Sequence, residues 1–283
     1  MPAVPHMDEA SPDVAVPWHY GDPLRETRAL VDGVGRVDLS NRGVLTITGP
    51  ERFSWLHTLT TAGISQATTS AQTLVLSPQG HIQHDIHVVS HDDTIYLIVE
   101  PGTQSEALRY FEMMRFMTQV EVADASDEWA VVGAPGWFLT EYPVWHSPKE
   151  YLGDGPVTYV PERPHPWQVS EYLVPRGQLQ DELRDSPAGT WAWEALRIRA
   201  GVPRLGFDID HRTIPHEVGL IAPAVHLEKG CYRGQETVAR VYNMGKPPRR
   251  LVQLELDGST NELPARGDEV LCEVDEVGAV TSV

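Results

Sequence analysis

Leu227–Glu236, which reads LEKGCYRGQE, is the most diagnostic stretch of this chain. It places Cys231, one of only two cysteines, between a lysine and a tyrosine inside a turn bracketed by Gly230 and Gly234. Glycine suits tight turns because it adopts backbone conformations that are costly for other residues. The run Gln235–Arg240 contains no breaker, so it predicts a short helix or strand directly after the turn.

The chemistry open to Cys231 depends on whether its thiol ionises. The thiolate is the nucleophile and the metal ligand, and a nearby ammonium such as that of Lys229 favours ionisation. A free cysteine is also commonly a small buried residue that only packs. Taken alone, the residues around Cys231 leave both interpretations open.

The octapeptide Lys229–Glu236, Lys-Gly-Cys-Tyr-x-Gly-Gln-Glu with Arg233 in the variable position, resembles the signature of the YgfZ-type folate-binding proteins. These are relatives of the T-protein (aminomethyltransferase) of the glycine cleavage system, in which the equivalent turn carries no cysteine. The resemblance implies tetrahydrofolate or a derivative in a central cavity. It also implies a role in iron–sulfur cluster assembly or repair, on which tRNA modification depends.

The resemblance extends over most of Leu24–Leu256. Val37–Ser40, followed after a strand by Gly49–Arg52, is similar to the opening of the T-protein fold. Leu76–Val88 resembles its second-layer hairpin, and Arg199–Glu217 resembles its middle region. The implied fold is α+β: a three-lobed ring of antiparallel sheets with covering helices, plus a small, incomplete C-terminal β-barrel.

Hydrophobic periodicity predicts elements that suit this architecture. An order of strands and helices of this kind favours an α+β layer in which helices cover one face of an antiparallel sheet. In the third predicted helix, Leu108, Phe111, Met114 and Phe116 are candidate core residues. The predicted helices are Leu24–Val31, Glu51–Leu59, Ser105–Met117 and Trp191–Ala200, and the predicted strands are Val44–Thr48, the two arms of Leu74–Ile82, Thr94–Val99, Trp129–Val132, Arg249–Leu256 and Glu269–Val274.

Three regions are expected along the chain. Residues 1–22 form a poorly ordered leader, because prolines and acids dominate and no basic or apolar signal segment is present. Residues 23–245 form the T-protein-like folate-binding region, made of two interleaved α+β lobes. Residues 246–283 form a β module that is truncated partway through a strand.

Composition restricts the class of protein. The chain of 283 residues is 41% hydrophobic and 22% charged, as expected for a soluble globular protein, and no apolar run is long enough to cross a membrane. Two cysteines form no disulfide framework, which indicates a cytoplasmic location. An iron–sulfur centre typically needs four thiolates, so Cys231 and Cys272 cannot hold one alone, and Cys272 is expected to be an ordinary packed strand residue.

The charge of the chain is unevenly distributed. The net charge of −18 argues against direct binding of extended nucleic acid. Between positions 197 and 250, however, ten lysines and arginines stand against five acids. This excess indicates either a surface that receives anions, such as a polyglutamylated folate, or scattered solvated side chains.

The resemblance also places a candidate folate site. Asp85 occupies the position of the second of two acids in the T-protein hairpin, His84 stands at the first, and Arg199 replaces a glutamate of the middle region. A guanidinium only donates hydrogen bonds, so these departures count against aminomethyl transfer and leave folate binding open. Arg240 and Trp193 complete the predicted cofactor-binding residues, and core packing remains the alternative for Trp193.

The octapeptide supplies the candidate catalytic residues, Cys231 and Lys229. Lys229 is expected to favour ionisation of Cys231, which acts as a nucleophile or a transient metal ligand at the cavity. Gly230 and Gly234 allow the tight turn, Gln235 and Glu236 hold it by hydrogen bonds, and Tyr232 packs beside the cavity.

Histidines at positions 81, 84, 87 and 91 suggest a metal site at first sight. On a strand, side chains alternate between faces, so His81 and His87 point one way while His84 shares the buried face with Ile82, Ile86 and Val88. This pattern favours a solvated, histidine-rich strand, and no resident metal is predicted.

Three functions therefore stand after sequence analysis. The first is a folate-binding accessory protein whose partners are folate and iron–sulfur assembly or client proteins. The second is a folate-dependent aminomethyltransferase-like enzyme, so the enzymatic status of the chain is left open. The third is a protein-interaction scaffold that ignores folate.

Overall fold

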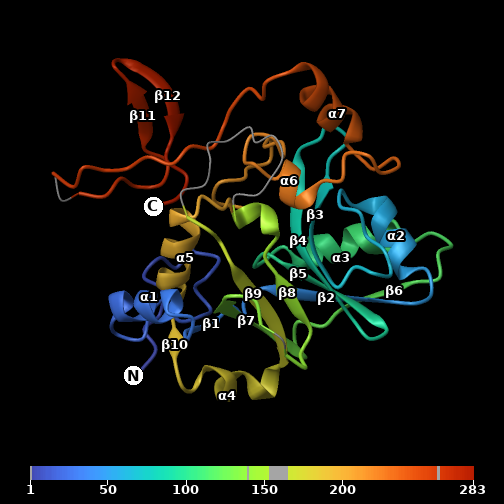
Figure 1. Ribbon diagram of the computed structural model, residues 1–283, viewed down its shortest axis with the longest axis horizontal. Helices are drawn as coiled ribbons and strands as arrows, with labels where there is room; N and C mark the ends of the chain where they lie inside the picture. Colours follow the sequence, from blue (N-terminus) through green and yellow to red (C-terminus); the bar gives the residue numbers. More distant parts are fainter. Residues whose placement is uncertain (1, 139, 153–164, 260–261) are drawn as a thin grey trace.

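The computed structural model describes residues 2–138, 140–152, 165–259 and 262–283 and shows a mixed α+β fold (Figure 1). Two five-stranded sheets form its body, and a two-stranded sheet lies near the C-terminus. The predicted α+β class is confirmed. None of the described helices has the length and apolar character needed to cross a membrane.

The first sheet is entirely antiparallel and has the strand order β3-β4-β5-β2-β6. Helices α2 and α3 cover its outer face, where Trp55, Leu56 and Phe111 pack against Leu45 and Ile86. The predicted layer of helices on an antiparallel sheet is therefore present. The elements are β2 (Gly43–Thr48), α2 (Arg52–Leu59), β3 (Ser70–Leu76), β4 (Ile82–His91), β5 (Thr94–Val99), α3 (Gln104–Met113) and β6 (Glu121–Asp124).

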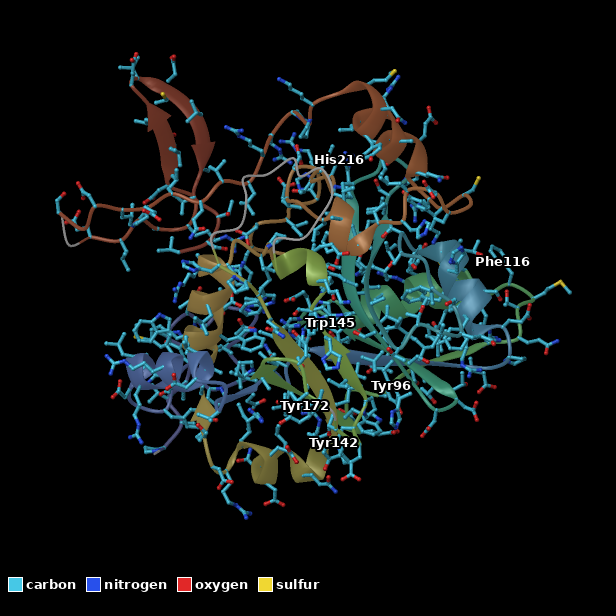
Figure 2. All side chains as sticks on the ribbon, in the orientation of Figure 1. Tyr96, Phe116, Tyr142, Trp145, Tyr172 and His216 are labelled. Carbon is cyan, nitrogen blue, oxygen red and sulfur yellow. The ribbon has the colours of Figure 1, made fainter. Side chains whose placement is uncertain are left out.

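The second sheet has the order β10-β1-β7-β9-β8, with only the β10–β1 pair parallel. Its outer face packs on α4, where Leu179 and Leu183 contact the cluster that contains Tyr172 (Figure 2). The elements are α1 (Pro23–Val31), β1 (Arg36–Asp38), β7 (Trp129–Pro135), β8 (Val144–His146), β9 (Val169–Pro175), α4 (Leu179–Leu183), β10 (Pro187–Ala188) and α5 (Thr190–Arg199).

The inner faces of the two sheets meet in the largest buried cluster of the chain. Leu74 and Ile98 from the first sheet share this cluster with Val131 and Leu173 from the second. Alternation along each strand sends one set of side chains outward to the helices and the other set inward, between the sheets. Polar residues on those inward faces therefore lie in the interface between the two sheets.

The remaining elements lie beyond the sheets. Figure 1 shows α7 beside the ends of β3 and β4, and β11 and β12 projecting away from the body. The remaining elements are the short 3-10 helices η1 (Lys149–Leu152) and η2 (Arg176–Gln178), α6 (Ile221–Ala224), α7 (Gln235–Met244), β11 (Glu269–Cys272) and β12 (Asp275–Ala279).

The predicted helix Ser105–Met117 is too long at its C-terminal end. Helix α3 ends at Met113, and Phe116 adopts a positive φ of 44° that carries the chain out of the helix. The side chain of Phe116 is 81% exposed (Figure 2) and is not part of the core. Phe111 is buried as predicted, and the predicted Leu108 and Met114 pack against the core while partly buried. Ala107 and Tyr110 complete the buried face of the helix.

The predicted strand Arg249–Leu256 is wrong. These residues have no strand pairing, although Leu251 donates its backbone N–H to the carbonyl of Glu217 at 2.7 Å. The sequence has a strand pattern because the apolar residues Val252, Leu254 and Leu256 alternate with other residues. In the structure these side chains are exposed, and no neighbouring strand pairs with the segment. Within the described part of the chain, β11 and β12 pair only with each other and close no barrel.

The leader is ordered, contrary to the expectation for residues 1–22. Over residues 2–22 it packs on the body, and Asp13 and Val16 are buried. The carbonyls of Pro17 and Trp18 accept the backbone N–H groups of Thr190 and Trp191 at 3.0 Å, which caps the start of α5. The composition suggested fraying, but these long-range bonds hold the segment in place.

Candidate functional site

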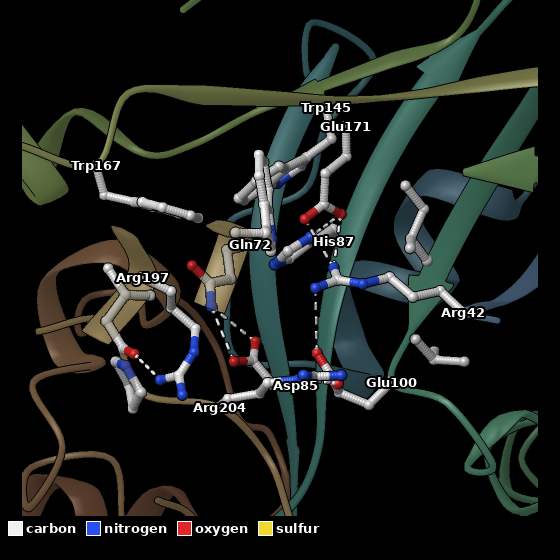
Figure 3. Close-up of a pocket in the computed structure, with 15 residues that line it drawn as sticks. Arg42, Gln72, Asp85, His87, Glu100, Trp145, Trp167, Glu171, Arg197 and Arg204 are labelled. Atoms are coloured by element: carbon white, nitrogen blue, oxygen red, sulfur yellow. Dashed lines mark hydrogen bonds and ion pairs between the residues drawn. The ribbon is translucent and has the colours of Figure 1, made fainter. Parts of the chain in front are cut away.

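A narrow cavity of about 30 Å³ lies between the inner faces of the two sheets (Figure 3). Its walls carry both charged and aromatic side chains. The polar ones are Arg42, Gln72, Asp85, His87, Glu100, Glu171, Arg197 and Arg204, and the aromatic ones are Trp145, Trp167 and Trp193.

Strand alternation explains why these side chains meet. On β4, His84, Ile86 and Val88 are buried on the helix-covered face, as predicted, so Asp85 and His87 point to the opposite face, which is the cavity and not the solvent expected for His87. Ile82 departs from the prediction, because the register shifts beside it and it lies in the cluster between the sheets. The same logic applies to the second sheet, where Glu171 on β9 and Trp145 on β8 line the cavity. His84, which stands at the position of a family acid, therefore faces away from the site.

Asp85 and Gln72 form a pair in the cavity wall. The Nε2 of Gln72 donates to both carboxylate oxygens of Asp85, at 2.8 and 3.0 Å. Burial raises the pKa of Asp85 to about 6, and His87, the hydrogen bond from Gln72 and Arg42 only partly oppose this shift. Asp85 is thus a carboxyl group that changes charge near neutral pH.

Glu171 is a second carboxylate in the same cavity, and its pKa is shifted in the opposite direction to that of Asp85. Burial alone would raise its pKa, but the Arg42 guanidinium and His87 lower the pKa of Glu171 to about 2. Nη1 of Arg42 lies 2.7 and 2.8 Å from the two carboxylate oxygens, and Nδ1 of His87 lies 2.8 Å from Oε2. Glu171 is therefore ionised far below neutral pH, whereas Asp85 becomes ionised only as the pH rises through about 6.

Aromatic rings line the other part of the cavity. The His87 ring is stacked on Trp145, with centroids 3.6 Å apart and an interplanar angle of 2°. Trp167 and Trp193 meet edge to face at 5.0 Å. Flat apolar walls of this kind suit a planar ring system.

Arg197 within α5 and Arg204 after it complete the charged network. Arg204 donates to both oxygens of Asp13 in the leader, at 2.6 and 2.8 Å, and to Glu100 at 2.8 Å. Arg197 contacts Glu194 and Asp208, each at 2.8 Å. Burial opposes the charge of both arginines, but these carboxylates hold the pKa of each one above its usual value.

The octapeptide turn docks onto the tip of the β3–β4 hairpin. Gly234 has a φ of 82°, and a Cβ there would lie 2.6 Å from the carbonyl oxygen of Ser77. Gly80, with a φ of 84°, would in turn meet Thr237 at 2.7 Å. Both glycines are needed for this close approach, after which α7 begins at Gln235.

Lys229 does not have the role predicted for it. Its ammonium donates to the backbone carbonyls of His57, Thr60 (2.6 Å) and Ala62 (2.7 Å). These carbonyls lie at the C-terminal end of α2, where a helix leaves acceptors unsatisfied and where a positive charge is favourable. Lys229 therefore caps α2 instead of directing its charge at Cys231, although burial lowers the pKa of Lys229 to about 8.

Cys231 is not at the cavity, which corrects a second prediction. Its side chain is exposed, and it is not among the cavity-lining residues. Gly80, which touches the turn, is five residues from Asp85; at about 3.3 Å per residue of strand, the turn lies on the order of 15 Å from that carboxylate. The structure therefore does not place Cys231 beside Asp85.

The other residues of the octapeptide lie in and around the turn. Gln235 donates to the carbonyl of Lys229 at 3.3 Å, which ties the turn together. Tyr232 is buried in the core cluster and its ring lies 5.4 Å from the Lys229 ammonium, but it does not line the cavity. Gly230 and Glu236 are exposed.

Two of the four predicted cofactor-binding residues do not reach the cavity. Asp85 and Trp193 line it, whereas Arg199 and Arg240 are exposed outside it. Arg199 lies in the last turn of α5, two residues after the inward-facing Arg197, so the helix turns it to solvent. Several cations of the predicted anion-receiving surface already have partners within the chain: Arg197, Arg204 and Arg249 pair with carboxylates, and Lys229 donates to backbone carbonyls.

Sequence reasoning missed most of the cavity. His87 was expected on a solvated face of its strand, but it lines the cavity. Glu171 was not singled out, although an acid in a strand that is buried at both neighbouring positions is a signal that could have found it. Arg42 just before β2 carried no comparable signal. Its partner Glu171 is 129 residues away, and only the packing of the two sheets brings them together.

Comparisons with known proteins agree with this fold. Residues 9–136 match the GCVT N-terminal domain family. The aminomethyltransferase of Thermoanaerobacter sp. (strain X514) is 24% identical over 298 residues, which covers 95% of this chain and 79% of the relative. That of Thermotoga maritima is 26% identical over 298 residues, which covers 94% and 79%.

The crystal structure of glycine cleavage system aminomethyltransferase T from Bartonella henselae matches with a TM-score of 0.71 at 18% sequence identity. The match covers 94% of this chain and 79% of that one. The chain therefore has the fold of the glycine cleavage T-protein, as the sequence predicted. The assignment to the YgfZ-type branch stays a prediction that rests on the octapeptide.

Proposed function

We propose that this protein binds a reduced folate in the cavity between its two sheets and acts as a cytoplasmic accessory protein in iron–sulfur cluster assembly or repair. The observation that carries the folate part is the Asp85–Gln72 pair, which faces a cavity walled by three tryptophans. The T-protein fold and the names of the relatives add support.

The chemistry of the cavity fits a pterin. The 2-amino group and the adjacent ring N–H of a pterin are neighbouring donors, and a carboxylate accepts two such bonds side by side. Asp85 supplies that carboxylate, and Trp167 and Trp193 offer apolar surface beside it. When bound, the folate would supply a ring that carries one-carbon units, while the residues of this chain bind and orient it.

Titration calorimetry with tetrahydrofolate tests the folate part directly. Saturable binding with one site per chain is expected, because the chain presents one such carboxylate–aromatic cavity in its described residues. A scaffold that ignores folate would give no heat of binding at ligand concentrations that saturate a control T-protein. That result would contradict the assignment of folate as the ligand.

Cys231 is the proposed contact to the iron–sulfur pathway. It is exposed on a turn that two close glycine contacts and the Lys229 cap hold rigid, so a partner protein has access to its sulfur. Its distance from Asp85 separates the two roles: the cavity holds the folate, and the turn meets the client or assembly protein. The partner supplies the remaining ligands of any shared cluster, because this chain has only two cysteines.

Cys231→Ala is expected to leave tetrahydrofolate affinity unchanged and to lower the activity of cluster-dependent enzymes in cells that lack the native protein. The reason is that the side chain is exposed and remote from the cavity. Cys272→Ala, which removes the other exposed cysteine, is the matched control. Full complementation by Cys231→Ala would remove Cys231 from the mechanism.

The second candidate is a folate-dependent aminomethyltransferase, favoured by the names of the relatives and by the inward position of Asp85. It predicts turnover of an aminomethyl donor that depends on tetrahydrofolate and is abolished by Asp85→Asn. The exposed position of Arg199, in place of a family glutamate, argues against it. Binding without turnover would leave the accessory role as the better account.

A further inference from the structure

His87 presents two chemically different nitrogens in the cavity. Its Nδ1 lies 2.8 Å from Glu171, whereas no described residue provides a hydrogen-bond partner for its Nε2. The ring is a lining residue of the cavity and is fixed in orientation by its stack on Trp145 (Figure 3). One nitrogen is therefore occupied by the protein and the other is left for a ligand.

The neighbours of Nδ1 determine which nitrogen carries the proton. Arg42 donates to both oxygens of Glu171, and an ionised carboxylate can only accept hydrogen bonds. Nδ1 must therefore carry the hydrogen in its bond to Glu171. In the neutral ring, this leaves Nε2 as a lone-pair acceptor, as in other histidines oriented by a carboxylate.

We propose that the Glu171–His87 pair is the element of this cavity that selects reduced over oxidised pterins, with Nε2 of His87 accepting a ring N–H of the ligand. This inference rests on the proposed folate binding. A tetrahydropterin carries hydrogens on N5 and N8, which are donors. In the fully oxidised ring both atoms are acceptors, so the same Nε2 faces a lone pair. Asp85, on the same face of β4, accepts the other edge of the ring, so this strand offers two acceptors that match the donors of a reduced pterin.

The test is calorimetric titration of the full chain with tetrahydrofolate and with folic acid under anaerobic conditions at pH 8. The wild-type protein is expected to prefer tetrahydrofolate. His87→Phe keeps a flat ring against Trp145 but removes the acceptor, and is expected to lower the affinity ratio about tenfold, the loss of one hydrogen bond in a buried site. His87→Gln retains an acceptor and is expected to keep most of the preference.

His91→Phe is the matched control, because it makes the same change on the same strand at a position that does not line the cavity. An equal affinity ratio in wild type and His87→Phe overturns the inference while leaving folate binding intact. Failure of the wild type to bind either compound overturns the proposed function as well. Nitrogen-15 NMR of the histidine rings gives an independent readout: a hydrogen on Nε2 instead of Nδ1 of His87 overturns the acceptor role.

Discussion

Asp85→Asn is expected to weaken tetrahydrofolate binding about a hundredfold. The carboxylate offers two acceptors to two adjacent pterin donors, whereas an amide offers one acceptor and turns a donor toward the second N–H. Hydrogen bonds to charged groups contribute about 1.5–3 kcal/mol each, and an opposed donor adds to that loss. Calorimetry at pH 8, where the wild-type carboxyl is ionised, measures the change.

The pH dependence of binding gives the same prediction a second readout. Because burial raises the pKa of Asp85 to about 6, the carboxylate form dominates above pH 6 and is lost as the pH falls below it. Affinity for tetrahydrofolate is therefore expected to be flat above pH 6.5 and to fall as the solution becomes more acidic, roughly tenfold per unit well below the pKa. Asp85→Asn is expected to remove this contribution.

As the pH falls through 6, the contribution of Asp85 to the unfolding free energy of the ligand-free protein is expected to become more favourable, whereas the affinity for folate falls. A carboxyl group whose pKa is higher in the folded protein than the ordinary 3.8 disfavours folding when ionised, so its effect is relieved as the pH falls through 6. The difference in unfolding free energy between wild type and Asp85→Asn isolates this contribution. Asp93→Asn, on the exposed turn after β4, is the control for the stability measurement. In the binding measurement, equal folate affinity in wild type and Asp85→Asn would contradict the assigned role of Asp85.

Local patterns predicted the frame of the site well. The alternation of His84, Ile86 and Val88 assigned the buried, helix-covered face of β4 correctly and placed Asp85 on the opposite face, although that face lines the cavity instead of meeting solvent and Ile82 lies between the sheets. Helix α5 begins and ends within one residue of its predicted limits. These features follow from side-chain periodicity, which acts over a few residues and can be read directly from the chain.

The parts that failed depend on partners far away in the sequence. The leader is held by Arg204 and by the start of α5, neither of which can be inferred from its own prolines and acids. Lys229 was assigned to Cys231 because the two are close in sequence, yet its ammonium reaches carbonyls 167 or more residues away. Closeness in sequence therefore did not predict which groups the Lys229 ammonium contacts.

Arg42→Met is expected to lower the free energy of unfolding by about 3 kcal/mol at pH 7.5. The side chains of Arg42 and Glu171 are only 7% and 3% exposed, and removing one partner of a buried ion pair leaves a charge without compensation. His87 still contacts Glu171, which keeps the loss near the lower end of the usual range. Chemical denaturation measures the change, and Arg184→Met, which breaks an exposed pair with Asp181, is expected to cost less than about 1 kcal/mol.

The deficit of Arg42→Met should shrink in acid. In the wild type the pKa of Glu171 is lowered to about 2, below the ordinary 4.5, so the pair contributes its stability above pH 4.5 and loses it as the pH falls toward 2. Without Arg42, burial raises the pKa of Glu171, and the carboxyl protonates sooner and ceases to be an uncompensated charge. Adding Glu171→Leu to Arg42→Met should recover part of the stability at pH 7.5, because both charges are then gone. If the single variant matched the wild type, or if the double variant were less stable than the single one, the pair would not be the electrostatic centre of this interface.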